Sequence, residues 1–408
     1  MNNLNPRLNS LQPYPFERLS KLLAGIEANK GFSAVNLSIG EPKHPTPKLV
    51  RDALCSSLEG LSSYPPTAGT PALRNVLANW LKRRFRLSKL DPLSQVLPVN
   101  GSREALFALA QTVLDPVIGE RDPGQRPMMI CPNPFYQIYE GAALLAGAEP
   151  FYVPQLAAND FRCDWDNVPE SVWQRTSLLF VCSPGNPTGS IIGLAEWAKL
   201  FELSRRYNFV IAADECYSEI YTDEAAPPMG AMQAAEQLGF GDFRNLVAFG
   251  SLSKRSNCPG MRSGYVAGDA RIIKAFLLYR TYHGSAMSPV VQTASIAAWS
   301  DEAHVVENRT AYREKYDAIT PRLAKILGTS RPEAGFYLWA RVPGGEDERF
   351  VAQLYAKYNV LLLPGSYLAR QSATGNPAAG YVRIALVEPL SLCLEGTSRI
   401  EQFVAESG

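Results

Sequence analysis

Short apolar runs alternate with amphipathic helical patterns along the middle of the chain. The stretch 194–207 predicts a helix, because its apolar residues recur at helical spacing on one face. The runs that predict buried strands are Val96–Val99, Met128–Ile130, Leu178–Cys182, Val210–Ala213, Leu246–Phe249 and Gly264–Ala267. This alternation predicts an α/β fold with a mostly parallel sheet that helices cover on both faces. Ligands of such folds bind beyond the carboxyl ends of the strands.

The pattern changes in the last third of the chain. A long helical stretch at 302–327 is followed by alternating strands near 336–340 and 382–385. These elements predict a smaller α+β domain that the N-terminal segment joins. We therefore expect three parts: a segment 1–45 that contributes to the small domain, a large domain 46–288, and the small domain 289–408.

Composition excludes several classes of function. The chain has 408 residues and a formal net charge of +1, with no basic stripe, which argues against nucleic acid as a partner. Seven cysteines without a C-x-x-C pair and three scattered histidines predict neither a disulfide framework nor a metal site. No apolar run is long enough to cross a membrane and the start is polar, so we expect a cytoplasmic protein.

The first candidate for a catalytic role is a lysine that follows a predicted strand. Ser251-Leu252-Ser253-Lys254 comes directly after the 246–249 run, and Arg262 stands eight residues beyond the lysine. A lysine amine can form a Schiff base with an aldehyde cofactor, and a serine hydroxyl and an arginine fork can hold its phosphate. Taken alone, this pattern is also consistent with solvated surface charges.

Two more strand ends carry polar groups. Asn186 stands between two prolines in the loop after the run 177–181, where a stiff backbone would hold its amide; a plain turn is the alternative. Asp214 closes the next apolar run, and burying its carboxylate is costly without a cationic partner; a helix cap is the alternative. Tyr217, three residues on, could donate its phenol proton to a cofactor oxygen.

An anion site and a carboxylate site are predicted elsewhere. Gly101-Ser102-Arg103 begins a helix whose free N–H groups and dipole favour a phosphate, although this segment taken alone favours an ordinary N-cap at Ser102. Arg383 lies inside an apolar strand, where an arginine needs a partner. A substrate carboxylate would match its guanidinium with two hydrogen bonds.

Together these segments resemble the class I/II aminotransferases of the pyridoxal phosphate (PLP)-dependent fold type I, over essentially the whole chain. The resemblance implies that Lys254 is the Schiff-base lysine and that Asp214 pairs with the pyridinium nitrogen of PLP. It implies that Tyr217 and Asn186 contact the ring's phenolic oxygen and that Tyr136 stacks on the ring. The residues that it places around the phosphate are Gly101, Ser102, Arg103, Ser251 and Arg262.

The resemblance also concerns the substrate and the assembly. It places Gly40, Asn186 and Arg383 on the substrate side, with Arg383 on the α-carboxylate. Tyr64 matches a tyrosine that reaches the phosphate of the neighbouring subunit. It therefore implies a homodimer with composite active sites.

A narrower resemblance points to succinyldiaminopimelate transaminase, in segments such as 37–45, 131–141, 278–284 and 331–339. It implies glutamate as amino donor and a succinylated keto or semialdehyde acceptor in lysine and diaminopimelate biosynthesis. Candidates for the distal carboxylates are Lys43, His44, Arg280 and His283.

The sequence is also consistent with other functions. They are a transaminase for acetylornithine, aspartate or another pair, a PLP-dependent lyase, and a cofactor-binding regulatory domain. The short segment before Ser38 leaves no room for a DNA-binding module, which disfavours the last. Aspartate-specific relatives carry a distal arginine twenty-six residues after the phosphate arginine; here that position is Ser288, which puts strict aspartate specificity in doubt.

Overall fold

The computed structural model describes residues 4–116, 125–372 and 375–407. Its largest sheet has the strand order β2-β8-β7-β6-β5-β3-β4. All neighbours between β7 and β4 pair in parallel, and β8 runs antiparallel to both β7 and β2. The strands are β2 (Val96–Val99), β3 (Met128–Asn133), β4 (Glu149–Pro154), β5 (Thr176–Cys182), β6 (Val210–Asp214), β7 (Leu246–Ser251) and β8 (Gly264–Gly268). The predicted mostly parallel sheet is confirmed, and β4 is the strand that the prediction lacked.

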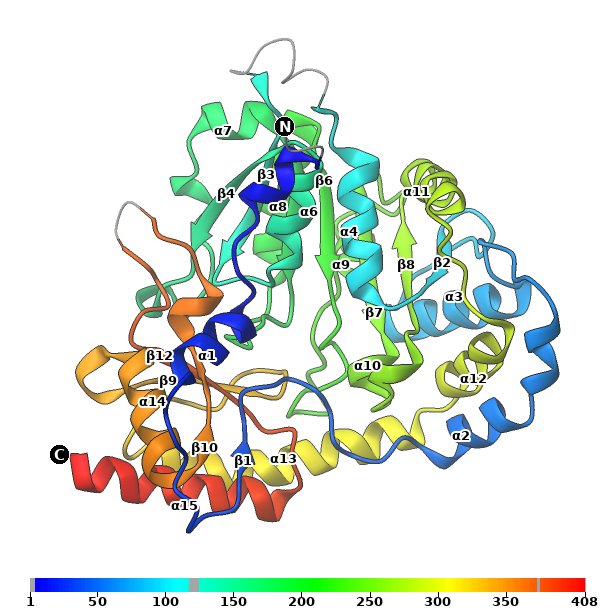
Figure 1. Cartoon of the computed structure of the whole chain (residues 1–408). Helices are drawn as coiled ribbons and strands as arrows, with labels where there is room; N and C mark the ends of the chain where they lie inside the picture. Colours follow the sequence, from blue (N-terminus) through cyan, green and yellow to red (C-terminus); the bar gives the residue numbers. More distant parts are fainter. Residues whose placement is uncertain (1–3, 117–124, 373–374, 408) are drawn as a thin grey trace.

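Alternate residues of the buried strands face two separate cores. On β6, Ile211 and Ala213 belong to one core and Ala212 to the other, because side chains of a strand point to opposite faces in turn. The helices of the first core are α3 (Pro71–Phe85), α8 (Leu194–Tyr207), α9 (Ala231–Gln237) and α12 (Pro289–Ser300). Those of the second are α4 (Ser102–Val113), α6 (Ile138–Leu145) and α11 (Ala270–His283). Helices thus cover both faces, as predicted (Figure 1).

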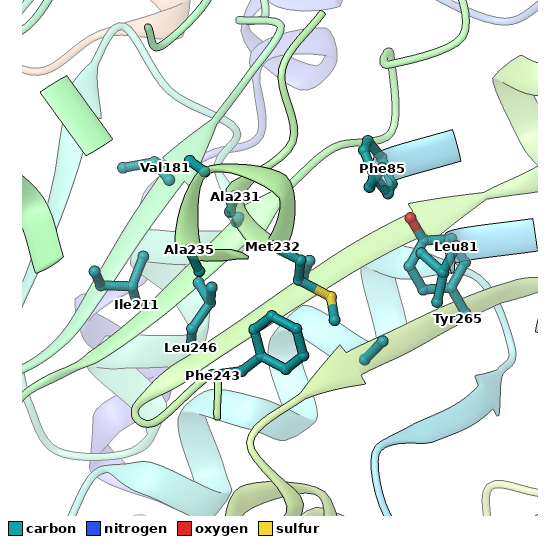
Figure 2. Close-up of a cluster of buried hydrophobic side chains, with 14 of the residues drawn as sticks. Leu81, Phe85, Val181, Ile211, Ala231, Met232, Ala235, Phe243, Leu246 and Tyr265 are labelled. Carbon is teal, nitrogen blue, oxygen red and sulfur yellow. The ribbon is translucent and has the colours of Figure 1, made fainter. Parts of the chain in front are cut away.

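Figure 2 shows how one helix closes the first core. Ala235 of α9 faces Ile211 and Leu246 of the central strands, whereas Met232 of the same helix points toward Phe243. All five side chains are almost completely buried. Burying such apolar side chains contributes roughly 1.5–3 kcal/mol for each large one, which holds the strand ends in place.

The C-terminal part forms a third core of its own. Its sheet has the order β11-β12-β9 and is antiparallel. The elements are α13 (Ala303–Leu323), β9 (Tyr337–Arg341), α14 (Asp347–Tyr358), β10 (Val360–Leu361), β11 (Leu363–Pro364), β12 (Tyr381–Ala385) and α15 (Leu390–Ser407). The 302–327 stretch is helical only over α13.

The N-terminal segment packs with this C-terminal part. β1 (Val35–Asn36) pairs in parallel with β10, and α1 (Pro15–Leu23) lies beside α14 and β11 (Figure 1). α2 (Lys48–Cys55) packs against α12 instead, on the side of the large sheet. By its packing α12 also joins the large sheet, and the division at residues 45 and 288 stays a prediction.

Candidate active site

A cavity of about 560 Å³ opens where the carboxyl ends of the central strands meet the C-terminal part. Strands β5, β6 and β7 end here, as expected for a parallel sheet. The predicted residues that line the cavity are Gly40, Ser102, Arg103, Tyr136, Asn186, Asp214, Tyr217, Ser251, Lys254, Arg262 and Arg383. Residues distant in the sequence are therefore brought together by the topology.

Two of the residues predicted to contact the cofactor do not line the cavity. Gly101 is the N-cap of α4 with a φ of 83°, and a Cβ there would lie 2.1 Å from Nη2 of Arg262. A glycine is thus required for Arg262 to approach the helix terminus. Ser102 is the first residue inside α4 and not its N-cap, so the alternative of an ordinary cap is wrong. Tyr64 lies in the segment before α3 with a fully exposed side chain.

Lys254 lies on the short helix α10 (Leu252–Arg255), directly after β7. Its Nζ donates a hydrogen bond to the carbonyl oxygen of Gly40 at 2.7 Å. Burial lowers the pKa of the Lys254 amine to about 8. The surface-charge alternative is therefore wrong, and about a tenth of the amine is neutral and nucleophilic at pH 7, far more than for a lysine at its ordinary pKa.

We expect this pKa to be measurable in the protein freed of any bound cofactor. The amine of Lys254 should react with acetic anhydride with a midpoint near pH 8, because only its neutral form is nucleophilic. Mass spectrometry of the labelled peptide gives the midpoint, and the exposed Lys274 serves as the internal reference. A Lys254 midpoint equal to that of Lys274 would contradict the prediction.

Asp214 ends β6 and is 4% exposed. Its Oδ2 accepts a hydrogen bond from the hydroxyl of Tyr139 at 2.7 Å, and its Oδ1 accepts one from the backbone N–H of Cys216 at 3.3 Å. Burial raises the pKa of the Asp214 carboxyl. No helix begins after Asp214 before α9, so the helix-cap alternative is wrong. Among the described residues the carboxylate forms no ion pair, which leaves it free for a cationic partner.

Arg383 approaches the cavity from β12. Its Nη1 donates to Oδ1 of Asn186 at 3.1 Å and its Nη2 to the carbonyl of Ser38 at 2.8 Å. The guanidinium lies 4.4 Å from the ring centre of Tyr337, and its Nε is buried with no hydrogen-bond partner in the described part of the chain. A buried donor without a partner is costly, so the site favours an acceptor such as a carboxylate.

Another part of the cavity wall carries groups that can bind an anion. Ser102 and Arg103 of the first turn of α4 line the cavity, as do Ser251 and Arg262, and Arg262 approaches the N-terminus of α4 at Gly101. Free backbone N–H groups, hydroxyls and a guanidinium are the donors that phosphate prefers. Nε of Arg103 also donates to the hydroxyl of Tyr136 at 2.6 Å, which fixes that ring at the cavity wall.

The sequence prediction missed several lining or supporting residues. Tyr139 lies in the first turn of α6, and its ring contacts that of Tyr136, which precedes the helix, with the ring centres 5.8 Å apart. Tyr337 contacts the hydroxyl of Tyr217 at 3.2 Å, and a Cβ at Gly40 would overlap with it. The N-terminal Tyr14 also lines the cavity. Neither Tyr337 nor Tyr14 carries a signal in the sequence, because only the fold brings them here.

None of the candidates for the distal carboxylates lines the cavity of this chain. Arg280 is 0% exposed and is bound to Glu104 and to the carbonyl of Pro98, so it is not available to a substrate. Lys43 pairs with Glu41, His44 contacts Asn308 and Lys315, and His283 is exposed at the end of α11. Ser288 is the N-cap of α12.

Comparison with known proteins agrees with this geometry. The family model "Aminotransferase class I and II" matches residues 33–388. The LL-diaminopimelate aminotransferase of Dehalococcoides mccartyi is 32% identical over 411 residues, which cover 99% of this chain and 100% of the relative. No helix in the described part of the chain is long and apolar enough to span a membrane.

Solved structures agree as well. An aminotransferase from Neisseria meningitidis has 52% identity and a TM-score of 0.93, covering 98% of this chain and 100% of that one. A probable N-succinyldiaminopimelate aminotransferase from Thermus thermophilus has 25% identity and a TM-score of 0.83, covering 95% and 99%. The resemblance predicted from the motifs is confirmed, and the chain belongs to the class I and II aminotransferases.

Proposed function

We propose that the protein is a PLP-dependent aminotransferase of diaminopimelate biosynthesis that uses glutamate as its amino donor. The observation that carries the proposal is one cavity that holds a partly buried lysine of lowered pKa, a buried carboxylate that forms no ion pair among the described residues, and an arginine with an unpartnered donor. Each of these is costly to keep in a fold, and each has a use in transamination.

The residues fit PLP as a cofactor. The α4 terminus with Ser102, together with Ser251 and Arg262, would hold the phosphate, and the absent Cβ of Gly101 keeps room for Arg262 beside it. Asp214 would hold a proton on the pyridine nitrogen, since a buried carboxylate favours a cationic partner. Tyr217 and Asn186 would hydrogen-bond the phenolic oxygen, and Tyr136 would stack on the ring.

The protein's own part in the reaction is binding, orientation and proton transfer. When bound, PLP supplies the electron sink that stabilises negative charge at the substrate's Cα. Arg383 binds the α-carboxylate and so orients the Cα–H bond for cleavage. The Lys254 amine, neutral in part near its pKa of about 8, removes the Cα proton as a base, and as an acid it would then deliver a proton to a carbon of the bound cofactor instead of to Cα.

The proposed substrate rests on sequence resemblance and on the residues that could bind its carboxylates. We propose N-succinyl-LL-2,6-diaminopimelate with 2-oxoglutarate as the reacting pair. The segments that resemble succinyldiaminopimelate transaminase support it, as does the absence of an arginine at Ser288. LL-diaminopimelate itself is the second candidate, because the relative from Dehalococcoides mccartyi carries that name. Both substrates offer Arg383 the same α-carboxylate and differ only at the distal end.

A substrate panel tests this assignment. With glutamate as donor, we expect kcat/KM to be higher for the succinylated keto acid, N-succinyl-2-amino-6-oxopimelate, than for oxaloacetate, pyruvate and N-acetylglutamate semialdehyde. Unsuccinylated tetrahydrodipicolinate, with its open-chain keto form, should be included as the acceptor that corresponds to LL-diaminopimelate. A higher kcat/KM for that compound would transfer the assignment to the second candidate. A higher value for any of the other three would leave only the general transaminase reaction.

We also propose a homodimer in which Tyr64 reaches the phosphate site of the partner subunit. Its side chain is fully exposed on the single chain, as are large parts of Leu58 and Leu61 close by. Exposed apolar and aromatic residues grouped in this way are typical of an interface.

Subunit mixing tests the composite site. Lys254→Ala and Tyr64→Phe subunits should regain activity when they are mixed under conditions that allow exchange, because one hybrid site then carries both native residues. Neither variant mixed with itself should gain activity. A fully active monomer in light scattering would contradict the proposal.

A further inference from the structure

A buried polar network lies behind Lys254, on the side away from the cavity. Asn308 of α13 is 4% exposed, and its Nδ2 donates to the carbonyl oxygen of Lys254 at 3.1 Å and to that of Arg255 at 3.4 Å. Helix α10 is four residues long, so these carbonyls near its end lack helical partners. Asn308 therefore supplies the bond that ends this helix and fixes the backbone of Lys254.

The orientation of the Asn308 amide follows from its neighbours. The Lys315 ammonium has only donors, and it contacts Nε2 of His44 at 2.7 Å, so Nε2 must accept. Nδ1 of neutral His44 then carries the hydrogen and faces Asn308 at 2.9 Å, where it needs an oxygen. The amide of Asn257 donates to the same oxygen at 2.9 Å. The other amide atom of Asn308, which faces Lys254, is consequently the nitrogen.

The protonation states of His44 and Lys315 agree with this orientation of the Asn308 amide. Burial and the charge of Lys315 lower the pKa of His44, so the imidazole is neutral at physiological pH. Burial lowers the pKa of Lys315 to about 8, which leaves it mostly protonated at pH 7. Lys315 is further held by the carbonyls of Leu386 and Val387 at 3.0 and 3.3 Å.

The network connects three of the segments that line the cavity, those of Gly40, Lys254 and Arg383. Leu386 and Val387 directly follow β12, which carries Arg383. His44 lies four residues after Gly40, whose carbonyl binds Nζ of Lys254. The main chain and the side chain of Lys254 are thus both held by segments that this network ties together.

We infer that Asn308 is a positioning residue for the Lys254 amine, and that His44 and Lys315 hold the Asn308 amide in its donating orientation. This inference rests on the proposed role of Lys254. The plain alternative is that the network only stabilises the packing of α13. The two differ in what they predict for the reactivity of Lys254 in folded protein.

Asn308→Asp is the sharpest variant, because it keeps the oxygen toward His44 and Asn257 and replaces the donor toward Lys254 with an acceptor. We expect kcat to fall about tenfold to a hundredfold while the KM for glutamate changes less than about threefold, since a misplaced reacting group costs turnover more than binding. In cofactor-free full-length protein, the acetylation midpoint of Lys254 should rise by about half a pH unit or more as the displaced amine gains solvent.

His44 and Lys315 supply variants that do not touch Lys254. His44→Leu and Lys315→Met should reproduce both effects more weakly. His44→Gln should recover at least about half of the wild-type kcat, because an amide offers one acceptor and one donor side by side, as neutral imidazole does. Thr320→Val on the same helix is the control, since the buried Thr320 hydroxyl has no partner among the described residues.

The outcomes separate the hypotheses. Wild-type kcat and a wild-type Lys254 midpoint in folded Asn308→Asp and His44→Leu, even with a lowered Tm, would overturn the inference and leave a structural role. Should Asn308→Asp not fold, the His44→Leu and His44→Gln pair decides alone. If the proposed function itself is wrong, wild-type protein shows no transamination, and the Lys254 midpoints still report on positioning.

Discussion

Replacing Lys254 with alanine should abolish transamination almost completely. We expect kcat to fall by at least about a thousandfold, because general acid–base catalysis alone contributes about 10²–10⁴ and the covalent attachment of the cofactor is lost as well. The fold should survive, since burying a lysine amine is unfavourable and alanine removes that cost. Steady-state kinetics and circular dichroism measure the two parts.

Borohydride reduction tests whether the cofactor is bound to Lys254 and not to another lysine. Reduction of the wild-type protein should fix the cofactor to the peptide that contains Lys254, and mass spectrometry should find no such adduct in Lys254→Ala. Lys274→Ala is the matched control, because Lys274 is an exposed lysine on α11 outside the cavity. An adduct on another lysine, or turnover above a hundredth of wild type in Lys254→Ala, would refute the role of Lys254.

The strand–helix alternation was sufficient to predict the large sheet, because its central strands are buried on both faces and read as continuous apolar runs. β4 was not predicted because it is not buried on both faces. It is an edge strand of intermediate burial that contains two prolines, which are tolerated only at such positions. Helix α8 was predicted with its observed bounds, 194–207, because its apolar stripe is regular.

The cofactor side of the candidate site was predictable because each of its segments stands directly at a strand end or a helix start. Asp214 is the last residue of β6 and Lys254 stands three residues after the end of β7, so the topology alone brings them together. The distal side was not predictable in this way. Arg280 was a candidate because its segment resembles succinyldiaminopimelate transaminase. In the structure, Arg280 instead forms an ion pair with Glu104 in the interior. A charged residue's partner depends on tertiary contacts that local sequence does not encode.

Tyr139 illustrates the same limit within the site. Its hydroxyl bond to Asp214 joins α6 to β6 across a sequence separation of 75 residues. The prediction gave Asp214 a cationic partner and left its neutral partners unassigned. The structure supplies two of them, the Tyr139 hydroxyl and the Cys216 N–H, and these define the position in which the carboxylate meets its ligand.

Asp214→Asn should separate function from stability. We expect kcat to fall by about a hundredfold or more, because a charge-assisted contact of roughly 3 kcal/mol is lost and each 1.4 kcal/mol is about tenfold. The Tm should not fall. Burial raises the pKa of folded Asp214 above its unfolded value, so at pH values above the folded pKa the ionised carboxylate costs stability that a neutral amide does not.

Tyr139→Phe is the matched variant for this test, since it removes one hydrogen bond to Asp214 and leaves the charge in place. Its kcat should lie between those of wild type and Asp214→Asn, with a loss of about tenfold. The absorption spectrum of the bound cofactor should shift in Asp214→Asn at pH values where the wild-type spectrum is constant, because an amide does not hold the ring proton. If Asp214→Asn turns over at more than a third of the wild-type rate, or loses no more activity than Tyr139→Phe, then the negative charge of Asp214 is not what the chemistry requires.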